Sequence, residues 1–309
     1  MTSTQEYAAA VIIPAHNEAG VIDRCLDAVD RARNGCDVQI VVVANGCSDD
    51  TAHRARRHPG VQVVDIETGS KSLALTVGDR TASAFPRIYV DADVVVDEQA
   101  LTGLITALNV EEPLAGTPRP FFDVAGSSAA VRAYYRVFTR LPYVREGLIG
   151  GGVYGMSRAG RARFGDFPDH LGDDLFVQRM FAPQERVVTA GSFRVLVPRT
   201  VSSLVKVRTR VARGNAQIAE DPTLASYATN VEGVTFAATT GGTVRALATL
   251  LRHEPARCAD AVVYVAVTLI ARRRARRTTA EATMWERDVS TRVPNGAVDA
   301  SGAVSTEVR

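Results

Sequence analysis

Asp91 and Asp93 are the residues of this sequence whose type and spacing point most directly to chemistry. They end an apolar run, "RIYVDADVVVD" at residues 87–97. Aspartate is depleted in strands and is costly to bury without a partner, so a strand that ends in two of them suggests a ligand. In an extended segment residues i and i+2 point the same way, and two such carboxylates suit a hard cation such as Mg²⁺ or Mn²⁺ that carries a diphosphate. Alone, the motif is also common where strands become loops.

Apolar runs alternate with helical patterns in the N-terminal part of the chain, and these elements would position the two aspartates. The runs occupy residues 8–13, 38–44, 61–66 and 87–90. The segment after the first run has apolar residues at helical spacing, namely Val21, Ile22, Leu26 and Val29. Strands that are apolar on both faces and alternate with helices indicate a doubly wound α/β fold, with a mostly parallel sheet and helices on both faces.

Polar residues follow three of these runs at the point where each strand would end. They are His16, Asn17 and Glu18, then Asn45 and Gly46, then Asp91 and Asp93. Open sheets of this kind bind ligands at the carboxyl ends of their strands, so these groups should face one crevice. The first loop, "PAHNEAG", has neither GxGxxG nor P-loop spacing, which argues against dinucleotide oxidoreductases and P-loop kinases.

The composition is that of an ordinary globular protein. The chain has 309 residues, of which 46% are hydrophobic, enough for one large α/β domain or two smaller ones. A formal charge of +2 argues against nucleic-acid binding by the whole chain. The four cysteines form no CxxC pair, and no basic residue precedes the short N-terminal apolar run. We therefore expect reduced thiols and a cytoplasmic protein.

The composition changes beyond about residue 198. We expect a basic and apolar helical extension over 201–277 and a polar, partly disordered tail over 278–309. The apolar run at 259–270 is too short to cross a bilayer and is followed by "RRRARR". Residues 259–277 therefore allow peripheral contact with an anionic membrane, which would be the inner face of the cell membrane. Equally, Val262, Val265 and Leu269 could pack onto the α/β domain with the arginines in solvent, whereas nucleic-acid binding has poor support.

Five stretches, in this order, resemble the family 2 glycosyltransferases, which have the GT-A fold. They are "VIIPAHNE", "VVVANGCSDDTA", "GSKSLALTVGDRTA", "YVDADVVVD" and "GGGVYGMSRAGRARFGDFPDHLGDDLFVQRMF". The resemblance covers roughly residues 10–213. It implies a GT-A catalytic domain over 1–200, with a nucleotide-sugar binding half at about 1–97 and an acceptor half at about 98–200.

The resemblance implies a nucleotide-sugar donor across the strand ends, with its nucleoside beside Pro14, Ala15, Asn17 and Glu18. Asn17 could instead cap a helix, and Glu18 could be a charge in the first turn of that helix. Asn45 stands where many relatives have an acid that binds the base. Because an amide carries no charge, a uridine donor does not follow from the resemblance.

Basic and glycine residues are also implied in donor binding. Lys71 stands where relatives have a basic residue near the donor, which suggests a phosphate contact, although a solvated lysine is the alternative. Gly151 and Gly152 would let the backbone pass close to the sugar or acceptor, unless they only form a tight turn. Arg210 and Arg213 resemble a basic segment that closes over the diphosphate. Processive synthases have a tryptophan after that segment, and its absence here favours transfer of a single sugar.

Four carboxylates would carry the chemistry that the resemblance implies. Asp91 and Asp93 match the DxD motif, which binds Mg²⁺ or Mn²⁺ and with it the diphosphate. "LGDDLF" supplies Asp173 and Asp174, which match an acidic pair of relatives, and a carboxylate near the acceptor hydroxyl can take its proton. The match favours Asp174 as the base and Asp173 as support, with the reverse assignment open. The alternative is that "GDD" caps a helix beginning near Leu175.

The predicted function is that of an inverting, metal-dependent glycosyltransferase. It would move one sugar from a nucleotide-sugar donor to a hydroxyl of a glycan, lipid-linked or small-molecule acceptor, for example in cell-surface polysaccharide or glycolipid assembly. Nucleic acid is not an expected partner. A noncatalytic binding module for sugar nucleotides or glycolipids on the same fold is an alternative. A sugar-nucleotide pyrophosphorylase fits less well, because it would want a glycine-rich loop with Arg or Lys after the first strand.

Overall fold

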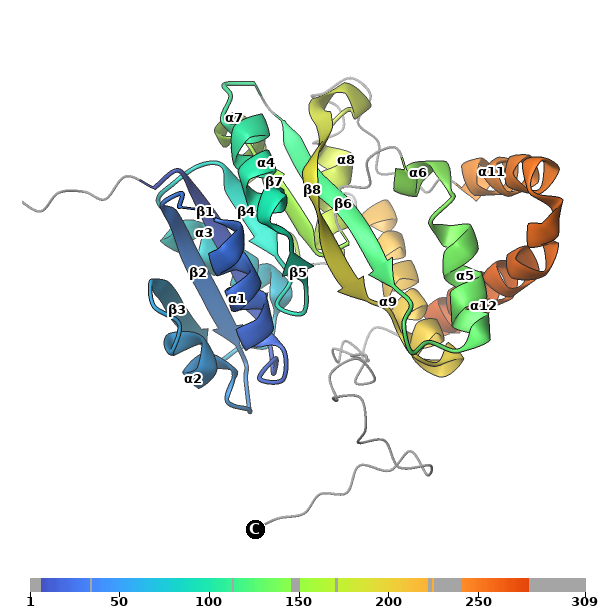
Figure 1. Ribbon diagram of the computed structural model, residues 1–309, viewed down its shortest axis with the longest axis horizontal. Coiled ribbons are helices and arrows are strands. Elements are labelled where there is room, and N and C mark those ends of the chain that lie inside the picture. The colour runs from blue at the N-terminus through green and yellow to red at the C-terminus, as the bar shows by residue number, and fades with distance from the viewer. Residues whose placement is uncertain are drawn as a thin grey trace, which may run out of the picture.

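The computed structural model describes residues 7–33, 35–112, 114–145, 151–169, 172–221, 224 and 240–277. Within these residues one sheet has eight strands in the order β3-β2-β1-β4-β7-β6-β8-β5 (Figure 1). In chain order the strands are β1 (Ala9–Ala15), β2 (Val38–Asn45), β3 (Val61–Ile66), β4 (Arg87–Val90), β5 (Val95–Val96), β6 (Ala115–Asp123), β7 (Val153–Met156) and β8 (Arg186–Leu196). The predicted tail at 278–309 lies outside the described residues.

The N-terminal half of the sheet is parallel, as the sequence predicts. β1 pairs with β2 and β4, and β2 pairs with β3, all in parallel. The four predicted apolar runs form these four strands. The other half is mixed, because β7 runs antiparallel to both β4 and β6, and β5 runs antiparallel to β8. The predicted fold class, a mostly parallel sheet of GT-A type with added C-terminal helices, is confirmed.

Helices cover both faces of the sheet because successive residues of β1 point to opposite sides (Figure 1). Val11 and Ile13 belong to the core shared with α1 (Ile22–Ala32) and α4 (Glu98–Leu108). Ile12 belongs to a second core, shared with α3 (Lys71–Thr81) and α8 (Asp173–Met180). α3 and α8 begin near the carboxyl ends of the parallel strands, where a ligand site is expected.

Side-chain caps fix the starts of the helices that follow the third and fourth parallel strands. Ser70 Oγ accepts from the backbone N–H of Leu73 at the start of α3. Asp97 Oδ1 accepts from the N–H of Gln99 at the start of α4. Each such cap typically contributes about 1 kcal/mol. Lys71 is consequently the first residue of α3, directly after its cap.

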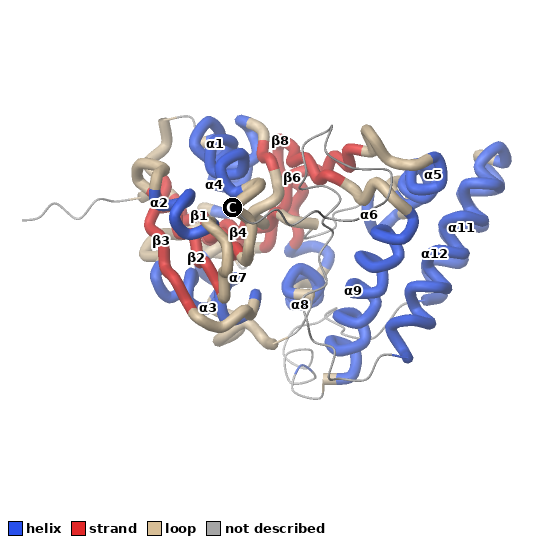
Figure 2. The backbone as a smooth tube through the Cα atoms, turned by 90° about the horizontal axis from the view of Figure 1, so that it is seen from below, coloured by secondary structure: helices blue, strands red, loops and turns tan. Residues whose placement is uncertain are grey.

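A third core joins helices at the end of the molecule away from β3 (Figure 2). It lies between α5 (Ala129–Phe138), α9 (Val201–Glu220) and α12 (Cys258–Arg277), and includes Tyr134, Leu204 and Tyr264. A helix, α11 (Thr240–His253), and the short η3 (Pro255–Arg257) lead into α12. The shorter helices α2 (Thr51–Arg56), α6 (Pro142–Arg145), α7 (Arg158–Arg161) and η1 (Pro183–Glu185) connect the remaining elements. None of the helices in the described ranges is long and apolar enough to cross a membrane.

Candidate active site

Lys71 joins the two acidic pairs that the sequence predicts to act together. Its Nζ lies 2.7 Å from Oδ1 of Asp91, at the end of β4, and 2.9 Å from Oδ1 of Asp173, the first residue of α8. The side chain of Lys71 is 24% exposed, so the solvated-lysine alternative is wrong. Three elements far apart in sequence thus meet at one ammonium group.

Asp173 is the most deeply placed of these charges. It is buried at 8% exposure, and its Oδ2 accepts from the hydroxyl of Tyr154 on β7 at 3.0 Å. Both carboxylate oxygens therefore have a partner, one cationic and one neutral. Burying a charge is tolerated when it is paired and hydrogen-bonded in this way.

Burial and crowding of negative charge raise the pKa of two carboxyls in the cluster. The pKa of Asp91 is raised by burial and by the neighbouring Asp173 and Asp93, against the opposing effect of Lys71. The pKa of Asp174 is raised by burial and by Asp173. Burial alone would lower the pKa of Lys71, but Asp173 and Asp91 more than offset it, so the ammonium is held in its charged form.

Gly151 and Gly152 connect the two acidic pairs through the backbone. The N–H of Gly151 donates to Oδ2 of Asp174 at 3.3 Å, and the carbonyl of Gly152 accepts from the N–H of Asp91 at 2.8 Å. Gly152 has a φ of +118°, and a Cβ there would lie 2.6 Å from Cγ2 of Val94. A side chain at this position would therefore collide with the segment that carries Asp91.

The capping alternative for "GDD" holds only in part: the N-cap position is not an aspartate, but Asp174 does satisfy a backbone N–H in the first turn of α8. α8 begins at Asp173 rather than near Leu175, and its N-cap is Gly172, which has no side chain to cap with. Asp174 instead accepts from the N–H of Leu175 at 2.7 Å through Oδ1. The two aspartates occupy the first turn, where the helix dipole favours negative charge.

Asp93 lies in the loop between β4 and β5. Its backbone carbonyl accepts from Arg24 on α1 at 3.4 Å, and its negative charge is one cause of the raised pKa of Asp91. No group of three or more His, Cys, Asp or Glu side chains among the described residues could form a metal site. Two carboxylates are nevertheless what Mg²⁺ commonly uses when substrate phosphates and waters complete its shell. Asp91 and Asp93 therefore fit a cation that binds together with a diphosphate.

The first two strand-end loops are tied to each other. Asn17 has a left-handed φ of +50°, and its Oδ1 accepts from the N–H of Ser48 at 2.6 Å. The N–H of Glu18, a buried residue, donates to Oγ1 of Thr51 at 2.6 Å. Because α1 begins at Ile22 with Val21 as its N-cap, the helix-cap and first-turn alternatives for Asn17 and Glu18 are wrong.

Asn45 is buried where β2 ends, next to β1. Its Nδ2 donates to the carbonyl of Ala15 at 2.8 Å, and Pro14 precedes Ala15 as a buried residue of β1. Oδ1 of Asn45 has no hydrogen-bond partner in the part of the chain that the structure describes. His16, through Nδ1, contacts the backbone carbonyl of Asn45. The position where many relatives are expected to have an acid is thus occupied by a buried, uncharged amide.

Arg210 and Arg213 lie on α9, partly buried, and form no ion pair with the carboxylates of the cluster among the described side chains. α9 itself comes close to the start of α8. A Cβ on Gly172 would lie 3.3 Å from Cδ1 of Ile218 and 3.9 Å from the carbonyl carbon of Gly214. The structure therefore places the helix of these arginines beside the start of the helix that carries the acidic pair.

Two residues near the site were not predicted from the sequence to be site residues. Tyr154 binds Asp173, and the available signal was a tyrosine within the glycine-rich "GGGVYGM". Its ring stacks on Tyr89 with centroids 4.9 Å apart. His16, which follows the first strand and is expected in the crevice, contacts the backbone carbonyl of Asn45.

The sheet and its strand-end carboxylates define an α/β protein of the GT-A class. Residues 10–164 match the family described as "Glycosyl transferase family 2", which is half of the chain. The chain therefore belongs to glycosyl transferase family 2, and the predicted enzyme class, a glycosyltransferase, is confirmed. No curated protein matches this chain in sequence.

Two proteins of known structure are similar to this chain. The mannosyltransferase PcManGT from Pyrobaculum calidifontis, in complex with GDP-Man and Mn²⁺, has a TM-score of 0.59 and 19% identity, with 88% of each chain covered. Glucosyl-3-phosphoglycerate synthase from Mycobacterium tuberculosis, in complex with Mn²⁺, UDP and glucosyl-3-phosphoglycerate, has a TM-score of 0.47 and 19% identity, covering 66% of this chain and 77% of that one. At this level of identity the first similarity supports the fold alone.

Proposed function

We propose that this chain moves a single sugar from a nucleotide-sugar donor to an acceptor hydroxyl, with inversion, at the cluster of Lys71, Asp91, Asp173 and Asp174. The observation that carries the proposal is the Lys71 ammonium, 2.7 Å from Asp91 and 2.9 Å from Asp173. It brings the carboxylate at the end of β4 and the acidic pair of α8 to one place. Sugar transfer needs one group that binds the leaving diphosphate and one that takes the proton of the acceptor, both close to the same anomeric carbon.

Asp91 and Asp93 are the residues that would hold Mg²⁺ or Mn²⁺ with the donor diphosphate. Such a cation stabilises the negative charge that develops on the departing diphosphate oxygen. Lys71 adds a fixed positive charge beside Asp91, and an ammonium there attracts phosphate oxygens. Because Asn45 at the end of β2 carries no charge, it does not by itself specify the donor base.

Asp174 is the proposed general base. Asp173 is buried with both oxygens engaged by Lys71 and Tyr154, whereas Asp174 is partly exposed and accepts backbone N–H groups. In the reaction the acceptor oxygen bonds to the anomeric carbon, and its proton passes to Asp174. The bond from that carbon to the diphosphate breaks, and its electron pair leaves with the diphosphate. A single displacement of this kind inverts the configuration.

The test is release of nucleoside diphosphate from uridine and guanosine diphosphate sugars, with and without Mn²⁺, in the presence of glycan, lipid-linked and small-molecule acceptors. We expect metal-dependent release that falls about a hundredfold or more in Asp91→Ala and Asp93→Ala. In Asp174→Asn, donor affinity should persist while transfer falls by a similar factor. Asp166→Asn, which breaks an exposed ion pair with Arg80, is the matched control and should leave both unchanged.

Three outcomes would count against the proposal. Full activity in Asp91→Ala or Asp93→Ala would remove the donor site from β4. Equal loss of donor affinity and transfer in Asp174→Asn would make that residue a structural support. Donor binding by the wild type with no transfer to any acceptor would favour the noncatalytic module.

A further inference from the structure

The outer face of α12 carries apolar side chains that the rest of the described structure leaves uncovered. Val262, Val265 and Leu269 are 68%, 39% and 52% exposed, and Ile270 is 44% exposed. The first three follow a spacing of three and four residues, which places them in a line along one side of the helix. We call this line, with Ile270 beside it, the outer stripe.

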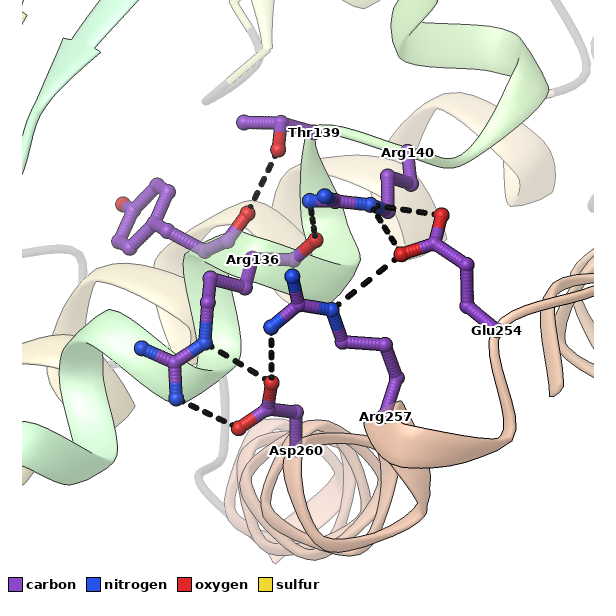
Figure 3. A network of polar contacts seen from close by, with 7 residues as sticks. Arg136, Thr139, Arg140, Glu254, Arg257 and Asp260 are labelled. Carbon is purple, nitrogen blue, oxygen red and sulfur yellow. Dashed lines mark hydrogen bonds and ion pairs between the residues drawn. The ribbon is translucent and has the colours of Figure 1, made fainter.

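The orientation of α12 is fixed by its opposite face. Tyr264 is buried, and its ring stacks on Tyr134 of α5 with centroids 5.0 Å apart. Asp260 pairs with Arg136 of α5 through two hydrogen bonds of 2.8 and 2.6 Å (Figure 3). Because these contacts hold the inner face against α5, the outer stripe cannot turn toward the core. The alternative that Val262, Val265 and Leu269 pack onto the α/β domain is therefore wrong, although the arginines that follow them are exposed, as it expects.

The loop before α12 is anchored by the same network. Glu254 accepts from Arg140, two residues after the end of α5, at 3.0 Å, and Arg257 bridges Glu254 and Asp260 at 3.3 and 3.2 Å (Figure 3). The two carboxylates of this segment are therefore committed to arginines of the protein itself. They are not available to partners that approach the outer stripe.

Positive charge continues the outer stripe toward the end of α12. Arg273 and Arg276 are exposed, and they lie eleven and fourteen positions after Val262, on the same side of the helix. From Val262 to Arg276 the stripe is about 21 Å long. Asp260 is the one carboxylate in the α12 sequence, and it is buried. The stripe therefore combines exposed aliphatic groups with cations and has no acid of its own.

We propose that the outer stripe of α12 docks this protein peripherally on an anionic lipid surface. Aliphatic groups at that surface lose contact with water among the headgroups, and arginines bind lipid phosphates while their stems stay apolar. A second copy of the chain fits less well. Its own stripe would bring arginines with no carboxylate to meet them. The proposal is independent of the sugar-transfer chemistry, because the stripe contains none of its residues.

The test is sedimentation of the full-length protein with vesicles of one part phosphatidylglycerol to two parts phosphatidylcholine, compared with vesicles of pure phosphatidylcholine. We expect binding to the anionic vesicles that weakens as salt is raised. One arginine near such a surface changes affinity about fivefold, so Arg273→Gln/Arg276→Gln should weaken binding about thirtyfold. Leu269→Ser, made alone, should also weaken vesicle binding, because an apolar contact with the lipid is lost.

The control is Arg31→Gln/Arg57→Gln, which removes the same charge from exposed positions on α1 and after α2. It should leave vesicle binding within twofold of the wild type. Equal weakening in the control, equal binding to both kinds of vesicle, or no binding by the wild type would overturn the proposal. So would an unchanged vesicle affinity in Leu269→Ser accompanied by a shift from dimer to monomer in solution. Transfer to a soluble acceptor should be the same in all variants, which separates this result from a failure of the proposed function.

Discussion

Replacing Lys71 with glutamine should destabilise the fold, because it leaves two carboxylates together without their cation. Lys71 holds Asp91 at 2.7 Å and Asp173 at 2.9 Å. Glutamine has nearly the same length and can still donate hydrogen bonds, so the change removes mainly the charge. The chain offers a matched control in Lys206, its other lysine, which is exposed on α9.

The size of the effect follows from how deeply each partner lies. Breaking a buried ion pair by removing one partner costs about 3–5 kcal/mol, whereas an exposed pair contributes about 0–1 kcal/mol. The side chain of Asp173 is 8% exposed and that of Asp91 is 37% exposed. Because Lys71 retains some contact with water, the low end of the cost of breaking a buried ion pair applies. We expect a loss of about 3 kcal/mol in the free energy of unfolding.

Urea unfolding at neutral pH measures this loss, and Lys206→Gln should change the free energy of unfolding by less than about 0.5 kcal/mol. The double variant Lys71→Gln/Asp173→Asn should be more stable than Lys71→Gln alone, because it removes the unpaired buried charge as well. A single variant as stable as the control would refute the reasoning. A double variant that adds the two losses in full would show that Lys71 and Asp173 do not interact.

Two further predictions concern Asp260 and Gly152. Hydrogen bonds from Arg136 lower the pKa of Asp260, so its stabilisation is present above the unfolded-state pKa of about 3.9 and is lost as pH falls through the lower folded value. Asp260→Asn should therefore cost about 1.5 kcal/mol at pH 7 and progressively less as the pH falls below about 3.9 in urea unfolding, and a pH-independent cost would contradict this. Gly152→Ala should cost about 2–3 kcal/mol, because its Cβ would collide with Val94 at a φ of +118°. Gly165→Ala, with nothing within 4 Å of its Cβ, should be neutral, and equal effects of the two would exclude the collision as the cause.

The parallel half of the sheet could be predicted because its strands carry an unambiguous signal. β1 and β2 are apolar on nearly every residue, and helical spacing separates them. The mixed half gives no comparable signal. β6 contains Pro118 and Pro120, and only Thr189 and Phe193 are buried among the eleven residues of β8. Pairing between such strands depends on contacts across the sheet, which no local pattern specifies.

The candidate site was predictable in its acids but not in how they are held. The resemblance supplied Asp91 and Asp173, whereas the ion pairs of Lys71 with both depend on three segments folding together. Asn17 illustrates the opposite error. An asparagine before a helical pattern suggests a cap. Asn17, however, has a left-handed backbone and lies four residues before Val21, the actual N-cap of α1. On α12 the sequence is apolar on both sides, so packing alone decided which side faces the solvent.

The close approach of Gly172 to Ile218 and Gly214 has a consequence for building chimaeras from this chain. The match to the family ends at residue 164, before the acidic pair of α8. α8 begins against α9, which shares a core with α5 and α12. A hybrid that exchanges residues beyond 164 must therefore transplant α8, α9 and the terminal helices as one block, together with an α5 that matches them. Grafts that cut between α8 and α9 would leave the acidic pair on a helix without its support.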